Sequence, residues 1–299
     1  MNKIMPNIKG KKNIRIKGHG SFYLREGWIT KGLKEIKRNP YVFSDKNAAD
    51  ILGVGSNMVS AIKYWITTLG LVESKVGENR KTKYVLSNLG KIIYEKDLYI
   101  EERFTLWILH YMLVKNQNSA TTWNLVFNNF DVKEFSKDEL FNFLNLEYTR
   151  LVGEGEFSVK SLNDDCTCLL KTYYSDNENL NPEENLICPF SELNILERKK
   201  NRFDKYVYTK LKINKAKLNP LVILYVLNDR SKKGSTTIDR LIEEENNIGK
   251  VFNLDRNEVN EYLDILEKQG YIEINRTAGL NTVYVKTNNN ILNQYYDKE

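Results

Sequence analysis

The sequence predicts a mostly helical α+β fold in which two winged helix-turn-helix modules flank a helical middle region. Three observations predict this fold. The segments 51–88 and 251–288 align without a gap at a constant offset of 200. Each segment has the residue pattern of a helix, a turn, a second helix and a β-hairpin. Between them, apolar residues in 98–150 recur at the spacing of helices.

The repeat combines identical residues with matched apolar positions. Identical pairs stand in one register: Asn57/Asn257, Val59/Val259, Gly70/Gly270, Glu73/Glu273, Thr82/Thr282, Tyr84/Tyr284, Val85/Val285 and Asn88/Asn288. Apolar character is also kept at Ile51/Val251, Leu52/Phe252, Val54/Leu254, Ile62/Tyr262, Ile66/Leu266, Leu71/Tyr271 and Val72/Ile272. Because matched apolar positions bury the same faces, this register predicts the same module twice.

The first copy predicts a complete module. Its helices are expected at 28–37, around 48–52 and from Ser56 or Asn57 to 69, and its strands at 71–73 and 83–86. Gly53 and Gly55 mark the turn before the third helix, and Gly70 ends that helix. We call the third helix the reading helix, because in a winged helix-turn-helix it lies in the major groove while the wing touches the backbone.

The second copy predicts helices at 220–227, 236–245 and 255–269, and strands at 271–274 and 282–286. Between the copies, Ser136 and Glu139 form a capping box that opens a further helix. The predicted organisation has five segments: a basic N-terminal arm at 1–27, a winged-helix DNA-binding domain at 28–97, a helical middle domain at 98–196, a basic linker at 197–218 and a second winged-helix domain at 219–290.

Positive charge is concentrated in two stretches. The chain holds 45 Lys and Arg against 39 Asp and Glu, and this excess alone decides little. The stretch 1–20 has no acid and holds Lys3, Lys9, Lys11, Lys12, Arg15 and Lys17. The stretch 198–217 has one acid, Asp204, and holds Arg198, Lys199, Lys200, Arg202, Lys205, Lys210, Lys212, Lys215 and Lys217. Such clusters attract phosphate backbones, and the alternative is a solvated tail and a solvated connector.

Composition argues against a membrane or secreted protein. No stretch approaches the roughly 18 apolar residues of a membrane span, and the first 20 residues lack the apolar region of a signal peptide. The three cysteines, Cys166, Cys168 and Cys188, match neither a disulfide framework nor the spacing of zinc ligands. We therefore expect a cytoplasmic protein with reduced thiols.

The two reading helices differ in exposed chemistry. The first presents neutral and basic groups, whereas the second presents Asp255, Glu258, Glu261 and Asp264, which a polyanion repels. We expect the first copy to bind double-stranded DNA and the second to be a partner-facing or dimerising unit, which leaves a homodimer open. The DNA-binding candidates are Arg25, Lys31, Ser56, Asn57, Ser60, Lys63, Tyr64, Arg80, Lys81 and Lys83.

Motifs of catalysis are scarce. The P-loop, the dinucleotide-binding and the H-E-x-x-H motifs are absent. His110 lies in an apolar helix and is expected to be a core residue. Asp164 and Asp165 form an acidic pair in a stretch expected to be a loop. Paired carboxylates can hold Mg²⁺ for phosphodiester cleavage, but an adjacent pair is more often only a turn. The weak catalytic candidates are His19, Asp164 and Asp165, and no metal ligand is assigned.

The segment from His19 to Gly32, HGSFYLREGWITKG, resembles the opening motif of the bacterial domain-of-unknown-function 4007 family. That family is found with DNA phosphorothioation genes, and the nickase-like B component of the Ssp anti-phage system is identified as a member. The resemblance implies DNA binding, and nicking of the backbone with Mg²⁺ before sulfur replaces a phosphate oxygen. The segment departs from the family's H-E-T-F form at Gly20 and Ser21, so this chain lacks the acidic residue there.

Three functions stay open. The leading hypothesis is a DNA-binding component of a phosphorothioation modification or anti-phage defence system, with nicking undecided. Its implied partners are DNA and the sulfur-transfer and ATPase proteins of the same system. The alternatives are a non-catalytic winged-helix transcriptional regulator and a scaffold that recruits modification enzymes through the acidic second module.

Overall fold

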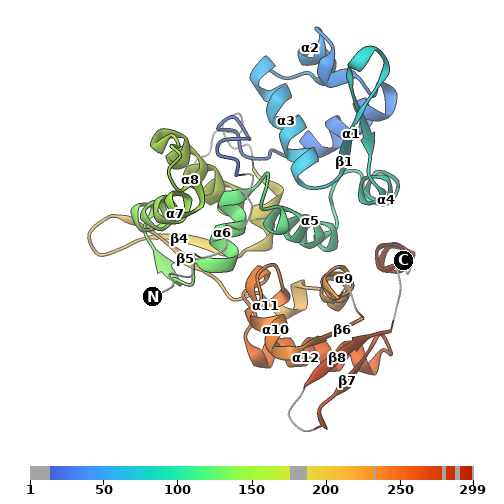
Figure 1. The fold of residues 1–299 in the computed structure, drawn as a ribbon, viewed down its shortest axis with the longest axis vertical. Helices are drawn as coiled ribbons and strands as arrows, with labels where there is room; N and C mark the ends of the chain where they lie inside the picture. The colour runs from blue at the N-terminus through green and yellow to red at the C-terminus, as the bar shows by residue number, and fades with distance from the viewer. Residues whose placement is uncertain (1–13, 176–186, 232–233, 278–280, 287–289, 298–299) are drawn as a thin grey trace, which may run out of the picture.

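The computed structural model describes residues 14–175, 187–231, 234–277, 281–286 and 290–297. Figure 1 shows the N-terminal module (28–97) at the top, the middle region (98–218) at the centre and left, and the C-terminal module (219–297) at the bottom. The fold is a mixed α+β fold of helices and small antiparallel sheets, as the sequence predicts. Part of the predicted basic arm lies outside the described residues: Lys3, Lys9, Lys11 and Lys12.

The N-terminal module contains four helices and one hairpin among its described residues. They are α1 (Trp28–Arg38), α2 (Ala48–Leu52), α3 (Ser56–Thr68), β1 (Val72–Val76), β2 (Thr82–Leu86) and α4 (Asn88–Lys96), with 3-10 turns at Val42–Ser44 and Glu78–Arg80. α3 buries Val59, Ile62 and Ile66, the stripe that recurs at spacings of three and four. β1 and β2 pair antiparallel, with Val72 opposite Leu86. The predicted reading helix and both strands are present.

The middle region combines helices with a small sheet. Its elements are α5 (Arg103–Lys115), α6 (Thr121–Asn129), β3 (Glu134–Phe135), α7 (Lys137–Val152), α8 (Val159–Tyr173), β4 (Leu196–Lys200) and β5 (Tyr206–Lys210), with 3-10 turns at Pro189–Leu193 and Lys215–Lys217. Ser136 and Glu139 form the predicted capping box of α7. Asp164 and Asp165 lie in α8 rather than in a loop, because buried Leu162, Cys166 and Leu169 recur at helical spacing around them.

The segment 197–218, predicted to be a basic linker, is instead largely a hairpin. β4 and β5 pair antiparallel from Leu196–Lys210 to Lys200–Tyr206, and β3 joins the other edge of β5, so the sheet order is β3-β5-β4. The high density of Lys and Arg conceals the strand pattern in the sequence. β-branched and aromatic residues of β5 explain the strand, since these side chains fit a pleated surface.

The C-terminal module repeats the first with additions. Its elements are α9 (Pro220–Arg230), β6 (Ser235–Thr237), α10 (Ile238–Glu243), α11 (Ile248–Val251), α12 (Arg256–Lys268), β7 (Ile272–Asn275), β8 (Thr282–Val285) and α13 (Ile291–Tyr296). The helix predicted at 236–245 is a strand followed by a shorter helix. β6 adds to the hairpin, and the sheet order is β6-β8-β7.

The offset of 200 holds in the backbone. α3 and α12 begin and end at equivalent positions, and both strands of each hairpin start at equivalent positions. The pairing of the hairpins differs by one residue, because Val72 lies opposite Leu86 whereas Ile272 lies opposite Val285. Gly70 and Gly270 both have left-handed backbone, with φ of 71° and 80°. In each copy, the amide after this glycine donates to the carbonyl five residues earlier at 3.0 Å. The structure thus repeats the helix end and the strand start, which the sequence register predicts.

α5 lies at the centre of the molecule (Figure 1) and contacts the C-terminal module through buried His110. The Nε2 atom of His110 donates to the Val251 carbonyl at 3.0 Å, and Nδ1 accepts from the Tyr173 hydroxyl at 2.8 Å. Burial lowers the pKa of His110 to about 4, so the ring is neutral at pH 7. The prediction of a core histidine is confirmed.

α13 packs against both α4 and α9, so the described end of the chain contacts both modules. No helix in the described ranges is long and apolar enough to cross a membrane. The three cysteines are buried free thiols, and burial raises the pKa of Cys166 and of Cys188 to about 12.

Candidate nucleic-acid interface

α3 presents small polar side chains at its start. The helix follows Gly55, and its first turn holds no acidic residue. Ser56, Asn57 and Ser60 are exposed. The first amides of a helix have no partner within it and carry partial positive charge, so this end is suited to an anion. Three of the predicted DNA-binding residues therefore lie on a surface compatible with phosphate.

A groove of about 410 Å³ lies beside α3, and we call it the α3 groove. Residues of the arm, α3, the β1–β2 hairpin and the loop between α5 and α6 line it: Arg15, Gly18, Ser60, Lys63, Tyr64, Thr67, Thr68, Ser74, Tyr84 and Ser119. The lining consists of cations, hydroxyls and one glycine, and no carboxylate is among these described residues. Cations and hydroxyls are common contacts of DNA phosphates. The structure brings Ser60 and Lys63 together and adds Arg15, which the sequence shows only as part of a basic arm.

Tyr64 is buried, which corrects the expectation that it faces DNA. Only 5% of the residue is exposed. Its hydroxyl donates to the Ser119 carbonyl at 2.8 Å, and burial raises its pKa well above the ordinary value. The Arg15 guanidinium lies over its ring, 5.3 Å from the centroid. The arm and the middle region cover this side of α3, which the pattern of α3 alone does not reveal. Tyr64 therefore helps to position Arg15.

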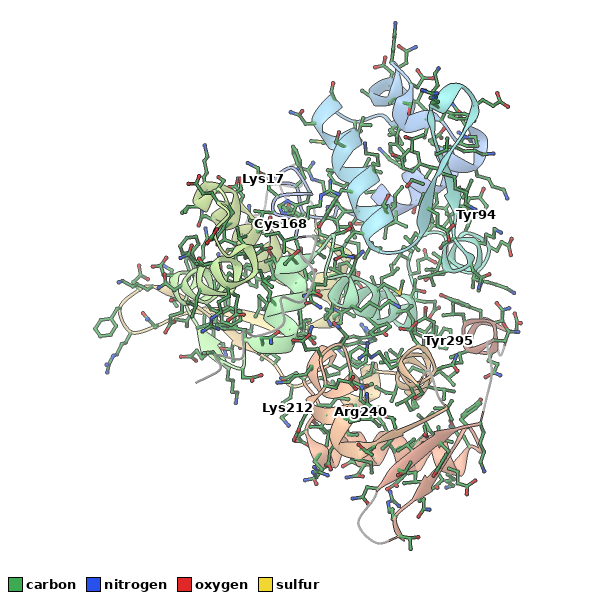
Figure 2. The ribbon with its side chains drawn as sticks, in the orientation of Figure 1. Lys17, Tyr94, Cys168, Lys212, Arg240 and Tyr295 are labelled. Carbon is green, nitrogen blue, oxygen red and sulfur yellow. The ribbon has the colours of Figure 1, made fainter. Side chains whose placement is uncertain are left out.

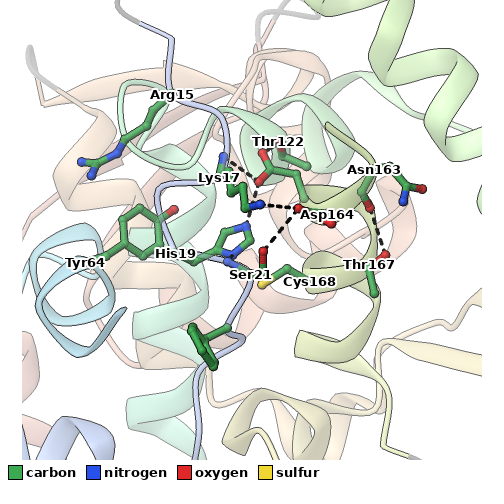
Figure 3. Close-up of polar contacts among 12 residues, drawn as sticks. Arg15, Lys17, His19, Ser21, Tyr64, Thr122, Asn163, Asp164, Thr167 and Cys168 are labelled. Carbon is green, nitrogen blue, oxygen red and sulfur yellow. Dashed lines mark hydrogen bonds and ion pairs between the residues drawn. The ribbon is translucent and has the colours of Figure 1, made fainter. Parts of the chain in front are cut away.

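A buried hydrogen-bond network fastens the arm to the middle region (Figure 3). His19 is 1% exposed, and its Nε2 lies 2.7 Å from Asp165 Oδ1. His19 Nδ1 accepts from the Ser21 amide, so Nε2 carries the proton and donates to the carboxylate. The Lys17 amide donates to the same oxygen at 2.8 Å, and the Thr122 hydroxyl donates to the other at 2.7 Å. We call these five residues the arm anchor.

Aromatic rings enclose the His19 ring of the arm anchor. The ring centroids of Tyr64, Trp65 and Trp123 lie 5.8 to 6.3 Å from that of His19. The Trp65 indole N–H donates to the Phe22 carbonyl at 3.0 Å. Both ring nitrogens of His19 have partners, so its geometry is that of a fastening residue rather than of an exposed base. Asp165 lies 146 positions from His19, and no local pattern predicts that pairing.

Asp164 and Asp165 do not fit the magnesium pair considered from the sequence. Both oxygens of Asp165 accept hydrogen bonds within the arm anchor, and the residue is 2% exposed. Asp164 pairs with Lys17 Nζ at 2.6 Å, and this hydrogen bond lowers the pKa of the Asp164 carboxyl. Adjacent residues of a helix point in different directions, and the two carboxylates are held apart by different groups of the arm: the Lys17 amide donates to Asp165 and Lys17 Nζ pairs with Asp164. In the described residues, no group of three or more His, Cys, Asp or Glu is placed to hold a metal ion.

The β1–β2 hairpin carries exposed cations at its turn. Arg80 and Lys81 are exposed, and Lys83 is half-buried. Within the part of the chain that the structure describes, the ion pair of this hairpin joins Lys75 to Glu73 and involves none of these three residues. Their charges are therefore available to phosphate. They lie outside the lining of the α3 groove, so they would form a second region of contact.

Arg25 lies among aromatic rings rather than against a carboxylate. Its guanidinium carbon lies 5.3 Å from the Trp28 ring centroid and 5.6 Å from that of Phe22. Its Nη1 lies 3.8 Å from Met58 Sδ in the first turn of α3, and no ion pair of Arg25 occurs among the described residues. Lys31 is exposed on α1. Arg25 thus keeps an unpaired cation close to the start of α3.

The corresponding surface of α12 is occupied by internal ion pairs. The pairs are Lys212 with Asp255 and Glu258, Lys215 with Glu261, and Arg276 with Asp264. Glu258, expected to be exposed, is only 7% exposed. Figure 2 shows Lys212 near the border between the middle region and the C-terminal module. Two cations of the predicted linker therefore neutralise acids of α12.

The model of the family described as "Protein of unknown function (DUF4007)" matches residues 16–296. This chain belongs to that family. The resemblance predicted from the segment 19–32 is therefore confirmed for the DUF4007 family. No curated protein matches the sequence.

Two solved structures share the fold of this DUF4007 protein. One, described as "Magnesium ion-bound SspB crystal structure", has a TM-score of 0.84 and 22% identity, over 94% of this chain and 88% of that one. The other, "SspB crystal structure", has a TM-score of 0.83 and 22% identity, over 96% and 90%. At this identity, the likeness establishes the fold.

Proposed function

We propose that this DUF4007 protein binds double-stranded DNA through the α3 groove and the β1–β2 hairpin, with the N-terminal module acting as a winged helix. The observation that carries the proposal is the α3 groove, in which Arg15 and Lys63 lie among hydroxyls and no described lining residue is a carboxylate. Such groups contact phosphates more than base edges. The protein should therefore bind duplexes of many sequences, and its affinity should fall steeply as the salt concentration rises.

The test compares two substitutions that change the charge equally. Lys63→Glu reverses a charge in the α3 groove, and Lys268→Glu reverses an exposed charge at the end of α12. We expect Lys63→Glu to weaken binding of every duplex at least about tenfold, by fluorescence anisotropy at one salt concentration. Lys268→Glu should bind like the wild type, and circular dichroism confirms that both variants fold. Equal losses in the two variants would remove the α3 groove from the interface.

We also propose that this DNA binding serves a phosphorothioation modification or anti-phage defence system, with its sulfur-transfer and ATPase proteins as partners. Membership of the DUF4007 family and the fold shared with the SspB structures support this role. Nicking is a separate question, because Asp164 and Asp165 do not fit a magnesium site. Incubation of supercoiled plasmid with the protein and Mg²⁺ decides it: open-circular product indicates a nickase, and unchanged plasmid indicates a binding protein.

A non-catalytic transcriptional regulator is the second candidate. The exposed Ser56 and Asn57 at the start of α3 favour it, because such side chains can bond to base edges in the major groove. Selection of bound sequences from a random duplex pool separates the two functions. One enriched sequence would indicate a regulator, and an unenriched pool would support binding to the backbone.

A further inference from the structure

A second cavity, far from the α3 groove in the chain, lies where the middle region meets the C-terminal module. It measures about 460 Å³, within the roughly 300–1,000 Å³ usual for small-molecule sites. Its walls come from the end of α6, the residues after β5, α10 and α11. Apolar side chains form much of the wall, among them Phe127, Phe130, Ile213, Ile242, Phe252 and Leu254. This lining is suited to the apolar part of a ligand.

Of the lysines that line this cavity, some form ion pairs with carboxylates, and Lys210 does not in the part of the chain that the structure describes. Lys250 pairs with Asp131 at 3.1 Å, and Lys212 pairs with acids of α12. Lys210 contacts no carboxylate among the described residues. Its Nζ donates to the Phe130 carbonyl and to the Val126 carbonyl, the second at 3.4 Å. An ammonium has three donors, so Lys210 retains one beyond these two contacts.

Burial makes the Lys210 charge costly. Desolvation lowers the pKa of Lys210 to about 8, and the nearby Lys250 charge also disfavours a second cation, although Asp131 partly offsets both effects. The remaining charged groups that line the cavity are Lys133, Lys212 and Glu243. A half-buried cation that touches no carboxylate among the described residues, next to an apolar cavity, is complementary to an anion that carries an apolar body.

We propose that this cavity binds a small amphiphilic carboxylate. The carboxylate would accept a hydrogen bond from Lys210, and the apolar body would contact the phenylalanine and isoleucine side chains. Because the walls belong to both parts of the molecule, an occupant would join the middle region to the C-terminal module. The inference is independent of DNA binding, since none of its residues lines the α3 groove.

Isothermal titration with octanoate and with octanol, which differ in charge, tests the proposal. We expect octanoate to bind one per chain and octanol to bind at least about tenfold more weakly, because a hydrogen bond between charged groups is lost. Lys210→Met should weaken octanoate about tenfold and leave octanol unchanged. The matched control is Lys215→Met, because Lys215 pairs with Glu261 outside the cavity. Equal affinity for octanoate and octanol, or octanoate binding that Lys210→Met does not alter, would overturn the proposal.

Two measurements keep the test decisive if Lys210→Met fails to fold. Ile242→Trp should fill the cavity and abolish binding of both probes while thermal unfolding stays cooperative. In the wild type, octanoate affinity should fall about tenfold per pH unit above pH 8, because the free Lys210 loses the proton that the anion requires. A flat pH profile up to pH 10, or octanoate that still binds Ile242→Trp, would place the ligand elsewhere.

Discussion

α3 and α12 occupy the same place in the repeat but carry different surfaces. Both helices contain 13 residues, and in both a glycine with left-handed backbone stands two residues after the helix end. α3 borders a groove of cations and hydroxyls, whereas the acids of α12 pair with Lys212, Lys215 and Arg276. The same backbone therefore supports an open basic surface in one copy and an internal contact in the other.

The segment before each module also differs. The arm reaches α8 through a buried His19–Asp165 hydrogen bond, whereas the segment after β5 reaches α12 through Lys212, which is exposed. Met58 of α3 and Glu258 of α12 occupy equivalent positions in the repeat and show this difference in attachment. Met58 contacts Arg25, which has no ion pair with any residue that the structure describes, whereas Glu258 pairs with Lys212. A buried network contributes more to stability than exposed pairs, so the modules should respond differently to substitution.

The largest effect is expected in the arm anchor. Asp165→Asn replaces a carboxylate that accepts hydrogen bonds from three donors. The NH₂ group of the asparagine is itself a donor, so at least one of these hydrogen bonds would be lost. We expect a loss of about 3 to 4 kcal/mol in the free energy of unfolding, measured by urea denaturation. Asp255→Asn is the matched control in the second module, because its ion pair is exposed and Asn also caps helices. Asp255→Asn should lower the free energy of unfolding by less than about 1 kcal/mol. Similar losses in the two variants would show that the arm anchor is no more stabilising than the exposed ion pair of α12.

Acid should next loosen the attachment of the C-terminal module to α5. The pKa of His110 is about 4 in the folded state, below the ordinary 6.5, so the fold favours the neutral ring. The stability that this provides is complete above pH 6.5 and is lost as the pH falls toward 4, by about 3 kcal/mol in all. His110→Gln does not titrate and should remove that part of the pH dependence. Urea unfolding at pH 7 and pH 4 measures it, and parallel losses in both proteins would exclude His110 as the cause.

A smaller effect is expected at the hairpin of the N-terminal module. Arg80→Ala/Lys81→Ala removes two exposed cations and should reduce DNA affinity several-fold. The slope of log affinity against log salt should become shallower by about 1.8, if each cation contacts one phosphate. Binding at four salt concentrations gives this slope. An unchanged slope in a folded variant would exclude the hairpin from the interface.

The smallest effect is expected on α12. Asp264→Lys removes an exposed acid that pairs with Arg276. Because this surface is not proposed to touch DNA, affinity should stay within about twofold of the wild type, with any change toward tighter binding. Electrophoretic mobility shift measures it. A tenfold loss would assign DNA binding to the C-terminal module and reverse the comparison.

The sequence alone determined the repeat and the fold class. Apolar spacing and the position of Gly70 and Gly270 predicted the third helices and hairpins, because local periodicity and backbone conformation depend on neighbouring residues. The resemblance of 19–32 predicted the DUF4007 family, which the comparison confirms. The position of the exposed Ser56, Asn57 and Ser60 also followed from the reading helix.

Only the tertiary structure decided which polar residues are free. Tyr64 is buried against Ser119, Asp165 binds His19, and Lys212 pairs with Glu258, although each pair is separated by more than 40 positions. Charge and helical spacing describe one element at a time, whereas burial and pairing depend on what another element covers. For the same reason, Lys210 beside its cavity, with no carboxylate partner among the described residues, and the α3 groove itself emerged only from the folded chain.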